Sequence, residues 1–275
     1  MKKLVMFLCF LFAGICIHQP AIAGPYAPAA GQSGSTAIHM DDPAFIGWAT
    51  GWENYSVGTS VDPQWQDPNI ALGKAVGTSG DIVSLGRGGQ ITLTFDTPIT
   101  DGDGWDFAVF ENSFSDTFLE LAYVEVSSDG ENFYRFDNNS LTSDPVLGFG
   151  SVEPTEITGY AGKYRQGYGT PFDLDYLHYL LIDPNDPSAG YKDVSGLDFN
   201  NVKYVKLLDI VGDGTYFDTF GNIIYDPYPT TGSAGLDLDA VGVINQAQAV
   251  PLPGALWLLG SGLVALIGFR RKQKD

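Results

Sequence analysis

The chain has very little cysteine, and none of it lies in the part that we expect to fold. Both cysteines, Cys9 and Cys16, fall within the first 23 residues. Those residues have a basic start, an apolar run and the small-residue sequence Ala21-Ile22-Ala23, which is the pattern of a secretory signal peptide. The sequence therefore predicts a signal helix at 1–23 and export by the Sec pathway. An exported protein without disulfide bonds must be stabilised by a large core or by a bound metal.

Basic residues are also scarce. Of the 14 Lys and Arg residues, two lie in the signal peptide and four at the C-terminus, which leaves 8, whereas 32 of the 33 Asp and Glu residues lie between these ends. The intervening body, residues 24–249, thus has a net charge of 8 − 32 = −24. Such a charge repels nucleic acid and anionic membrane surfaces, so neither is an expected partner of the body. It is compatible with the binding of cations.

Histidine and long helical periodicity are nearly absent as well. The body contains only His39 and His178, which have no metal-ligand spacing, so a zinc site is not expected. No Gly-x-Ser-x-Gly sequence supports a serine hydrolase. Short runs of alternating or continuous apolar residues recur instead, and Gly and Pro residues separate them. We expect strands within 90–95, 106–112, 122–136, 202–210 and 236–244, the third range being a hairpin about Asp129-Gly130.

These runs predict an all-β protein, either a β-sandwich or a jelly roll. The less regular, aromatic-rich residues 24–70 are expected to pack on the sandwich as a lead-in segment. The sandwich domain is expected to span 71–245. Residues 246–275 form a separate C-terminal region.

Six segments follow one another in order within the expected sandwich domain: Ala71–Gly77, Val83–Phe95, Val124–Phe136, Gly162–Leu174, Val202–Ile210 and Gly235–Asn245. Together they resemble the discoidin-like, galactose-binding-type β-sandwich domains of bacterial surface proteins. The resemblance implies a jelly roll of about eight strands. It also implies a structural calcium ion in many members and a carbohydrate site in the loops of some.

The C-terminal region combines a proline pair, an apolar run and a basic end. Val250-Pro251-Leu252-Pro253 precedes a Leu-Leu-Gly-Ser-Gly-Leu sequence and the basic residues Arg270 and Arg271. These features resemble the PEP-CTERM sorting signal of Gram-negative bacteria that produce exopolysaccharide, although Leu252 stands where that signal usually has Glu. The resemblance implies a hydrophobic sorting helix in the membrane, cleavage by an exosortase-type membrane protease, and delivery to the cell surface or matrix. A permanent single-pass anchor is the alternative.

Carboxylates are the only abundant reactive groups, so a metal site is tested first. Asp101, Asp103 and Asp106 lie in the glycine-rich sequence DGDGWD, where alternating carboxylates can converge on Ca²⁺. The closing Glu of an EF-hand is missing from this sequence, because Glu111 lies one residue too early. The alternative is a solvated acidic turn.

A second acidic set comprises Asp209, Asp213, Asp237 and Asp239, with Asp218 and Asp226 in the same part of the chain. Because side chains alternate along a strand, Asp237 and Asp239 are expected on one face of the last strand. On a dry face two carboxylates are costly unless they are paired or metal-bound, so calcium is the predicted cofactor here too. The alternatives are that both point to water or accept hydrogen bonds from backbone amides of neighbouring loops.

Two further kinds of site remain. Glu111 ends an apolar strand and is the best candidate for a glycosidase carboxylate, but that chemistry needs a partner carboxylate, and the sequence assigns none. Trp105, Tyr164 and Tyr168 are candidate carbohydrate contacts, because sugars stack on exposed aromatic faces. The alternative is that such rings fill the core.

The sequence therefore favours a non-catalytic surface protein that is stabilised by calcium and binds, or belongs to, an extracellular polysaccharide matrix. A polysaccharide hydrolase that remodels the matrix and a membrane-tethered structural protein without a ligand are the alternatives.

Overall fold

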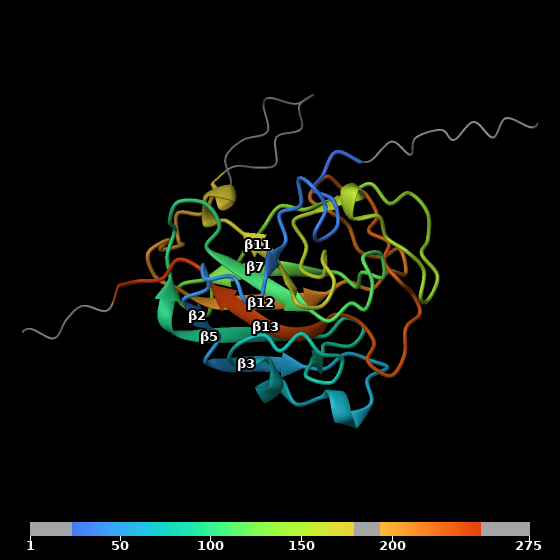
Figure 1. The fold of residues 1–275 in the computed structure, drawn as a ribbon, viewed down its shortest axis with the longest axis horizontal. Coiled ribbons are helices and arrows are strands. Elements are labelled where there is room, and N and C mark those ends of the chain that lie inside the picture. The colour runs from blue at the N-terminus through green and yellow to red at the C-terminus, as the bar shows by residue number, and fades with distance from the viewer. Residues whose placement is uncertain (1–23, 179–192, 249–275) are drawn as a thin grey trace, which may run out of the picture.

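The computed structural model describes residues 24–178 and 193–248 (Figure 1). The expected signal helix and sorting helix lie outside these residues. None of the helices within them has the length and apolar character that crossing a membrane requires. The strands are β1 (Ile38–His39), β2 (Gly47–Trp48), β3 (Gly51–Ser56), β4 (Val83–Ser84), β5 (Gln90–Ile99), β6 (Phe107–Glu111), β7 (Ala122–Ser127), β8 (Tyr134–Arg135), β9 (Asn139–Ser140), β10 (Ile157–Thr158), β11 (Tyr168–Phe172), β12 (Val202–Asp209) and β13 (Asp237–Val243). Four short 3₁₀ helices accompany them: η1 (Pro63–Trp65), η2 (Pro68–Ala71), η3 (Pro154–Glu156) and η4 (Leu174–Leu177).

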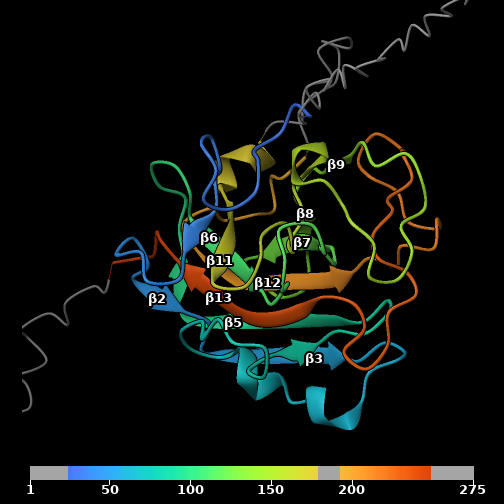
Figure 2. The same cartoon turned by 45° about the vertical axis from the view of Figure 1, so that its right-hand side comes forward.

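Two antiparallel sheets form the centre of the molecule, and long loops surround them (Figure 2). The six-stranded sheet has the order β1-β11-β6-β13-β2, and its β4 also pairs with β13. The five-stranded sheet has the order β3-β5-β12-β7-β8, while β9 and β10 form a separate pair. The all-β prediction is therefore confirmed, and the arrangement is that of a β-sandwich.

Strands form in each of the five ranges that the sequence pattern predicts, whereas β1 to β4 and β9 to β11 lie outside those ranges. Ile91 and Leu93 of β5 are buried in the core, and every residue of β6 is buried, as its continuous apolar run requires. The predicted hairpin is β7–β8, with Val126 opposite Tyr134. At its turn Asp129 accepts hydrogen bonds from the amides of Glu131 and Asn132.

The main core lies between the two sheets. The five-stranded sheet contributes residues such as Val124 and Leu207, and the six-stranded sheet contributes Phe107, Val109 and Val241, all of which are fully buried. Burial of apolar side chains from both sheets is the main force that holds them together. This core forms without a disulfide bond.

The expected lead-in segment, residues 24–70, supplies strands to both sheets. β3 forms one edge of the five-stranded sheet by pairing with β5, where Trp52 lies opposite Leu93. β1 and β2 extend the six-stranded sheet at its two ends. The helices η1 and η2 follow β3 and lie beside it in both views (Figures 1 and 2).

Candidate functional site

Asp106 fastens the loop before β6 to two other segments. Its side chain is buried and accepts hydrogen bonds from the amide of Gly102 at 2.9 Å, the amide of Leu174 at 2.8 Å and Nδ2 of Asn245 at 2.9 Å. These contacts join the DGDGWD loop to η4 and to the residues after β13. Burial raises the pKa of Asp106 to about 6, and the three hydrogen bonds counteract part of that rise.

Asp101 brings further carboxylates together around this loop. One ligand atom each from Asp101, Asp106 and Asp173 lie within 4.8 Å of one another, and the same holds for Asp101, Asp175 and His178. One carboxylate oxygen of Asp101 is buried and has no hydrogen-bond partner. Burial raises the pKa of Asp101, and so does the nearby carboxylate of Asp175. Two carboxylates this close repel one another unless they share a proton or a cation.

The two sets together comprise five residues, which we call the acidic loop group: Asp101, Asp106, Asp173, Asp175 and His178. Its carboxylate oxygens fit Ca²⁺. Asp103, which the sequence also suggested, is exposed and belongs to neither set of three. Asp173 and Asp175 were missed by the sequence analysis. The alternating carboxylates of the sequence DLD in front of Tyr176 are the signal that could have revealed them.

A large cavity opens beside the acidic loop group. Its volume is about 490 Å³, and its aromatic lining consists of Tyr26, Trp105, Phe136, Phe172 and Tyr176. We call it the aromatic cavity. The rings of Trp105 and Tyr176 meet edge to face with their centroids 5.9 Å apart. Each of these two rings is adjacent in sequence to a carboxylate of the acidic loop group.

Polar groups complete the lining of the aromatic cavity. They include Thr36, Asp137, Thr158 and Lys163. The Lys163 amine is buried and donates hydrogen bonds to the carbonyl oxygens of Pro154, at 2.6 Å, and Ile157. Burial lowers the pKa of Lys163 to about 7. Aromatic faces, hydroxyl groups, a carboxylate and an amine thus surround one space.

The three predicted carbohydrate contacts do not meet in this cavity. Trp105 lines it, whereas Tyr164 is buried and its hydroxyl group is 2.8 Å from Oγ1 of Thr36. Tyr164 therefore offers no exposed face for stacking, and burial is the reason that this expectation is corrected. Tyr168 begins β11 outside the cavity lining and packs against His39 and the guanidinium group of Arg165.

The second predicted acidic set does not form one cluster. Asp239 accepts hydrogen bonds from the amides of Val76 at 3.0 Å and Gly77 at 2.8 Å. This arrangement is the alternative to a metal site in which the carboxylate is bonded to backbone amides of a neighbouring loop. The pairing of β13 with β6 is irregular between Leu238 and Ala240, so simple alternation does not hold at Asp239.

The other members of that set have separate partners. Asp209 is buried and bonded to the amides of Gly88 and Leu236, whereas Asp213 is exposed and bonded to Thr215. Among the described residues, neither Asp209, Asp213, Asp237 nor Asp239 belongs to a compact set of three metal-ligating side chains.

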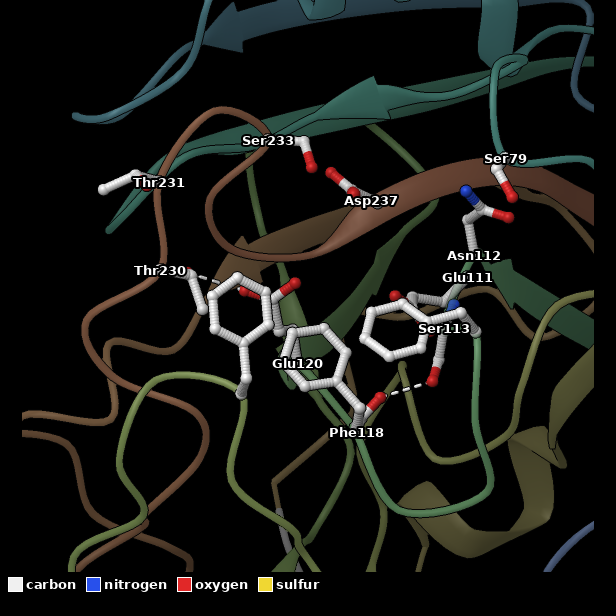
Figure 3. A pocket seen from close by; sticks show the side chains of 12 residues that line it. Ser79, Glu111, Asn112, Ser113, Phe118, Glu120, Thr230, Thr231, Ser233 and Asp237 are labelled. Atoms are coloured by element: carbon white, nitrogen blue, oxygen red, sulfur yellow. Dashed lines mark hydrogen bonds between the residues drawn. The ribbon is translucent and has the colours of Figure 1, made fainter.

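Asp237 instead joins two glutamates in a cavity of about 190 Å³, which we call the carboxylate cavity (Figure 3). Glu111 ends β6, Glu120 precedes β7, and Asp237 begins β13. Burial, followed by repulsion from neighbouring carboxylates, raises the pKa of both glutamates well above the usual value. Burial likewise raises the pKa of Asp237 to about 7.

Hydrogen bonds hold each carboxylate of this cavity. Glu111 accepts from the amide of Ser113 at 2.7 Å, Glu120 accepts from the hydroxyl group of Thr230 at 2.8 Å, and Asp237 accepts from Ser84. The structure therefore gives Glu111 the neighbouring carboxylates that the sequence could not assign. A charged residue inside the apolar run FLELAY was the signal for Glu120.

Comparison with known proteins assigns the C-terminal region. Residues 249–272, which lie outside the described residues, match the family model of the PEP-CTERM protein-sorting motif. The predicted sorting signal with Val250, Pro251, Pro253, Arg270 and Arg271 is thereby confirmed. The motif indicates a secreted protein that is sorted to the cell surface, and it implies processing by an exosortase. A comparison with curated proteins found no match to the chain.

Proposed function

We propose that this protein is a non-catalytic component of the extracellular matrix that binds polysaccharide in the aromatic cavity and is stabilised by calcium at the acidic loop group. The observation that carries the proposal is the pair formed by Trp105 and Tyr176 at the cavity wall. Tyr176 is 56% exposed, so an aromatic face remains available to a sugar ring.

The polar lining favours a carbohydrate over a purely apolar ligand. Thr36, Thr158, Asp137 and Lys163 present groups that can exchange hydrogen bonds with sugar hydroxyls. Asp137 is the one acidic residue among the described residues that line the cavity. Glycoside hydrolysis uses two carboxylates, so we propose binding rather than cleavage at this site.

Calcium has a structural role in the proposal. A Ca²⁺ ion held by Asp101 with Asp173 or Asp175 would neutralise carboxylates that otherwise repel one another. It would also fix the two segments that carry Trp105 and Tyr176. The resemblance to discoidin-like, galactose-binding-type domains supports both a jelly-roll fold and this use of calcium.

Sorting to the cell surface supports the proposed ligand, because it brings the protein to extracellular polysaccharide. Export by the Sec pathway and a transient membrane contact through the sorting helix, before exosortase processing, complete the proposed route.

Affinity electrophoresis against a panel of bacterial exopolysaccharides, combined with a glycan array, tests the proposal. We expect a polysaccharide to retard the wild-type protein and Trp105→Ala to weaken its binding about tenfold, because an aromatic stacking face is lost. Trp52→Ala is the matched control, since Trp52 is partly exposed on β3, donates a hydrogen bond to Asn69 and does not belong to the cavity lining. Wild-type protein that binds no glycan, or equal binding by Trp105→Ala, would contradict the proposal.

A further inference from the structure

A stack of three phenylalanine rings forms one side of the carboxylate cavity. Phe114 and Phe118 are stacked with their centroids 4.6 Å apart, and Phe118 and Phe149 are stacked at 5.7 Å. Phe118 is buried, whereas Phe114 is 64% exposed and Phe149 is 72% exposed. All three rings line the cavity. A contiguous exposed apolar surface of this kind marks a site of contact with another molecule.

The backbone at Phe149 has a conformation that glycine adopts more readily than an aromatic residue. Phe149 has a φ of 62°, a left-handed conformation that bulky residues rarely adopt. Glycine would take this conformation without strain, and the neighbours Gly148 and Gly150 show that glycine is used on both sides. The chain nevertheless carries a large aromatic side chain here, and most of that side chain faces solvent.

The rest of the cavity lining is rich in hydrogen-bond acceptors. Glu111, Glu120 and Asp237 are buried there, and Figure 3 shows their carboxyl groups around one hollow. The side-chain oxygen of Asn112, another lining residue, is buried and accepts no hydrogen bond. None of the described residues that line the cavity is Lys, Arg or His. The cavity therefore presents acceptors without a cationic partner.

A bare metal ion does not fit this arrangement well. Among the described residues, the three carboxylates do not form a set whose ligand atoms lie within 4.8 Å of one another. Calcium requires oxygen ligands at about 2.3–2.6 Å, and aromatic rings are not ligands for it. An organic cation is larger and can contact both the phenylalanine rings and the carboxylates, because its charge is attracted to the faces of aromatic rings as well as to carboxylates.

We propose that the carboxylate cavity is a binding site for a small organic ammonium group. The nitrogen lies toward Glu111, Glu120 and Asp237, and its carbon substituents lie against the phenylalanine stack. A primary ammonium group also donates a hydrogen bond to the free oxygen of Asn112, whereas a quaternary ammonium group has no N–H and is held by its charge alone. A cavity of about 190 Å³ holds a small group rather than an extended ligand. The group could be carried by an amino sugar or by a choline or ethanolamine head group, which share this chemistry. This site is separate from the aromatic cavity, and the inference does not rest on the proposed polysaccharide binding.

Isothermal titration calorimetry on the full chain tests the inference with four probes: choline, ethanolamine, glucosamine and the neutral analogue N-acetylglucosamine. We expect at least one ammonium compound to bind and N-acetylglucosamine not to bind. Glucosamine as the tightest probe would point to an amino sugar, whereas choline or ethanolamine would point to a lipid head group. Either result supports the ammonium site.

Two variants locate the binding. Phe149→Ala removes an exposed ring and should weaken binding about fivefold without loss of folding. Phe217→Ala is the matched control, because Phe217 is 52% exposed and lies outside the cavity lining. Asp237→Asn should weaken binding about tenfold or more, since a charged hydrogen-bond partner is lost.

Failure of all three ammonium probes to bind, equal binding of N-acetylglucosamine, or unchanged binding by Phe149→Ala would overturn the inference. Polysaccharide binding that depends on Trp105 should be unaffected by Phe149→Ala, because Phe149 does not line the aromatic cavity, so the two proposals fail independently.

Discussion

Trp105 and Tyr176 meet edge to face, with their ring planes at 81°, although Trp105 precedes β6 and Tyr176 lies in η4. Asp106 follows the first ring in sequence, and Asp175 precedes the second. The aromatic pair in the cavity wall and the acidic loop group are therefore built from the same two segments. A change in the acidic loop group should consequently alter the positions of the Trp105 and Tyr176 rings.

Removing the exposed ring of this pair tests its role in binding. Tyr176→Ala should weaken polysaccharide binding about fivefold, because a stacking face and its contact with Trp105 are lost. Its free energy of unfolding should change by less than about 0.5 kcal/mol, as is usual for an exposed side chain. Calorimetry and urea denaturation measure the two quantities. Phe220→Ala, which also removes a partly exposed ring, should leave binding unchanged; equal effects of both variants would argue against a specific site.

Calcium should raise the melting temperature through the acidic loop group. At a free concentration one hundred times its Kd, the expected rise is about 5–10 °C. Asp175→Asn should abolish most of this rise, and it should not lower the stability of the calcium-free protein, because it removes repulsion from Asp101. Asp103→Asn is the control, since Asp103 is outside both sets of ligands. Thermal scans with calcium and with EDTA provide the measurement, and identical scans would contradict the calcium proposal.

Asp106 should matter for stability whether or not calcium is bound. Asp106→Ala leaves the donors of Gly102, Leu174 and Asn245 without their acceptor, so it should lower the free energy of unfolding by about 3 kcal/mol. Asp106→Asn keeps one acceptor oxygen and should cost less. Chemical denaturation of both variants checks this order, and an unchanged midpoint for Asp106→Ala would show that water replaces the carboxylate.

The calcium-free protein should become less stable as the pH rises from about 5 to about 7. Burial raises the pKa of Asp209 and Asp237 from 3.8 to about 7, and that of Asp106 to about 6. Between these values and the unfolded pKa, the folded chain binds more protons than the unfolded chain. Stability from the protonated groups is thus fully present below the unfolded pKa and is lost as the pH rises through the folded pKa.

Lys163 acts in the opposite direction but in a different window. Its pKa falls to about 7 in the folded protein, whereas the unfolded side chain titrates near 10.5. Its contribution to stability therefore rises with pH, but only above about pH 7.

Melting temperatures of the calcium-free protein at about pH 5 and about pH 7 test the prediction for the carboxyl groups, and Asp237→Asn should make the difference between these two temperatures smaller. A melting temperature that rises between about pH 5 and about pH 7 would contradict the assignment.

The sorting motif predicts the fate of the C-terminus. Mass spectrometry of the protein from the cell surface should find a C-terminus near Pro253, without Arg270 and Arg271. Deletion of residues 250–275 should release the protein into the medium, because the sequence read by the exosortase is removed. An intact C-terminus on surface protein would instead favour a permanent anchor.

Local sequence pattern was sufficient for much of the fold. The apolar positions of β5, the continuous apolar run of β6 and the Asp129-Gly130 turn each depend on neighbouring residues, and each appears in the structure as expected, although Thr92 of β5 is buried together with its apolar neighbours. The same holds for the placement of Asp101 and Asp106 in one set, because only four residues of a glycine-rich loop separate them. The C-terminal motif is also readable without a structure.

Tertiary packing decided which of these residues form sites. Asp173, Asp175 and Tyr176 reach the DGDGWD loop because β11 pairs with β6, and Asp237 reaches Glu111 because β13 pairs with β6. Glu120 is held beside them by hydrogen bonds from Thr230 and Gly235, which precede β13. Nothing in the local sequence distinguishes Tyr164 from Tyr176, yet Tyr164 is buried and Tyr176 is exposed. Sequence alternation reports which face of its own strand a residue occupies. It does not report which distant segment lies opposite, because that is determined by how the two sheets bury their apolar faces together.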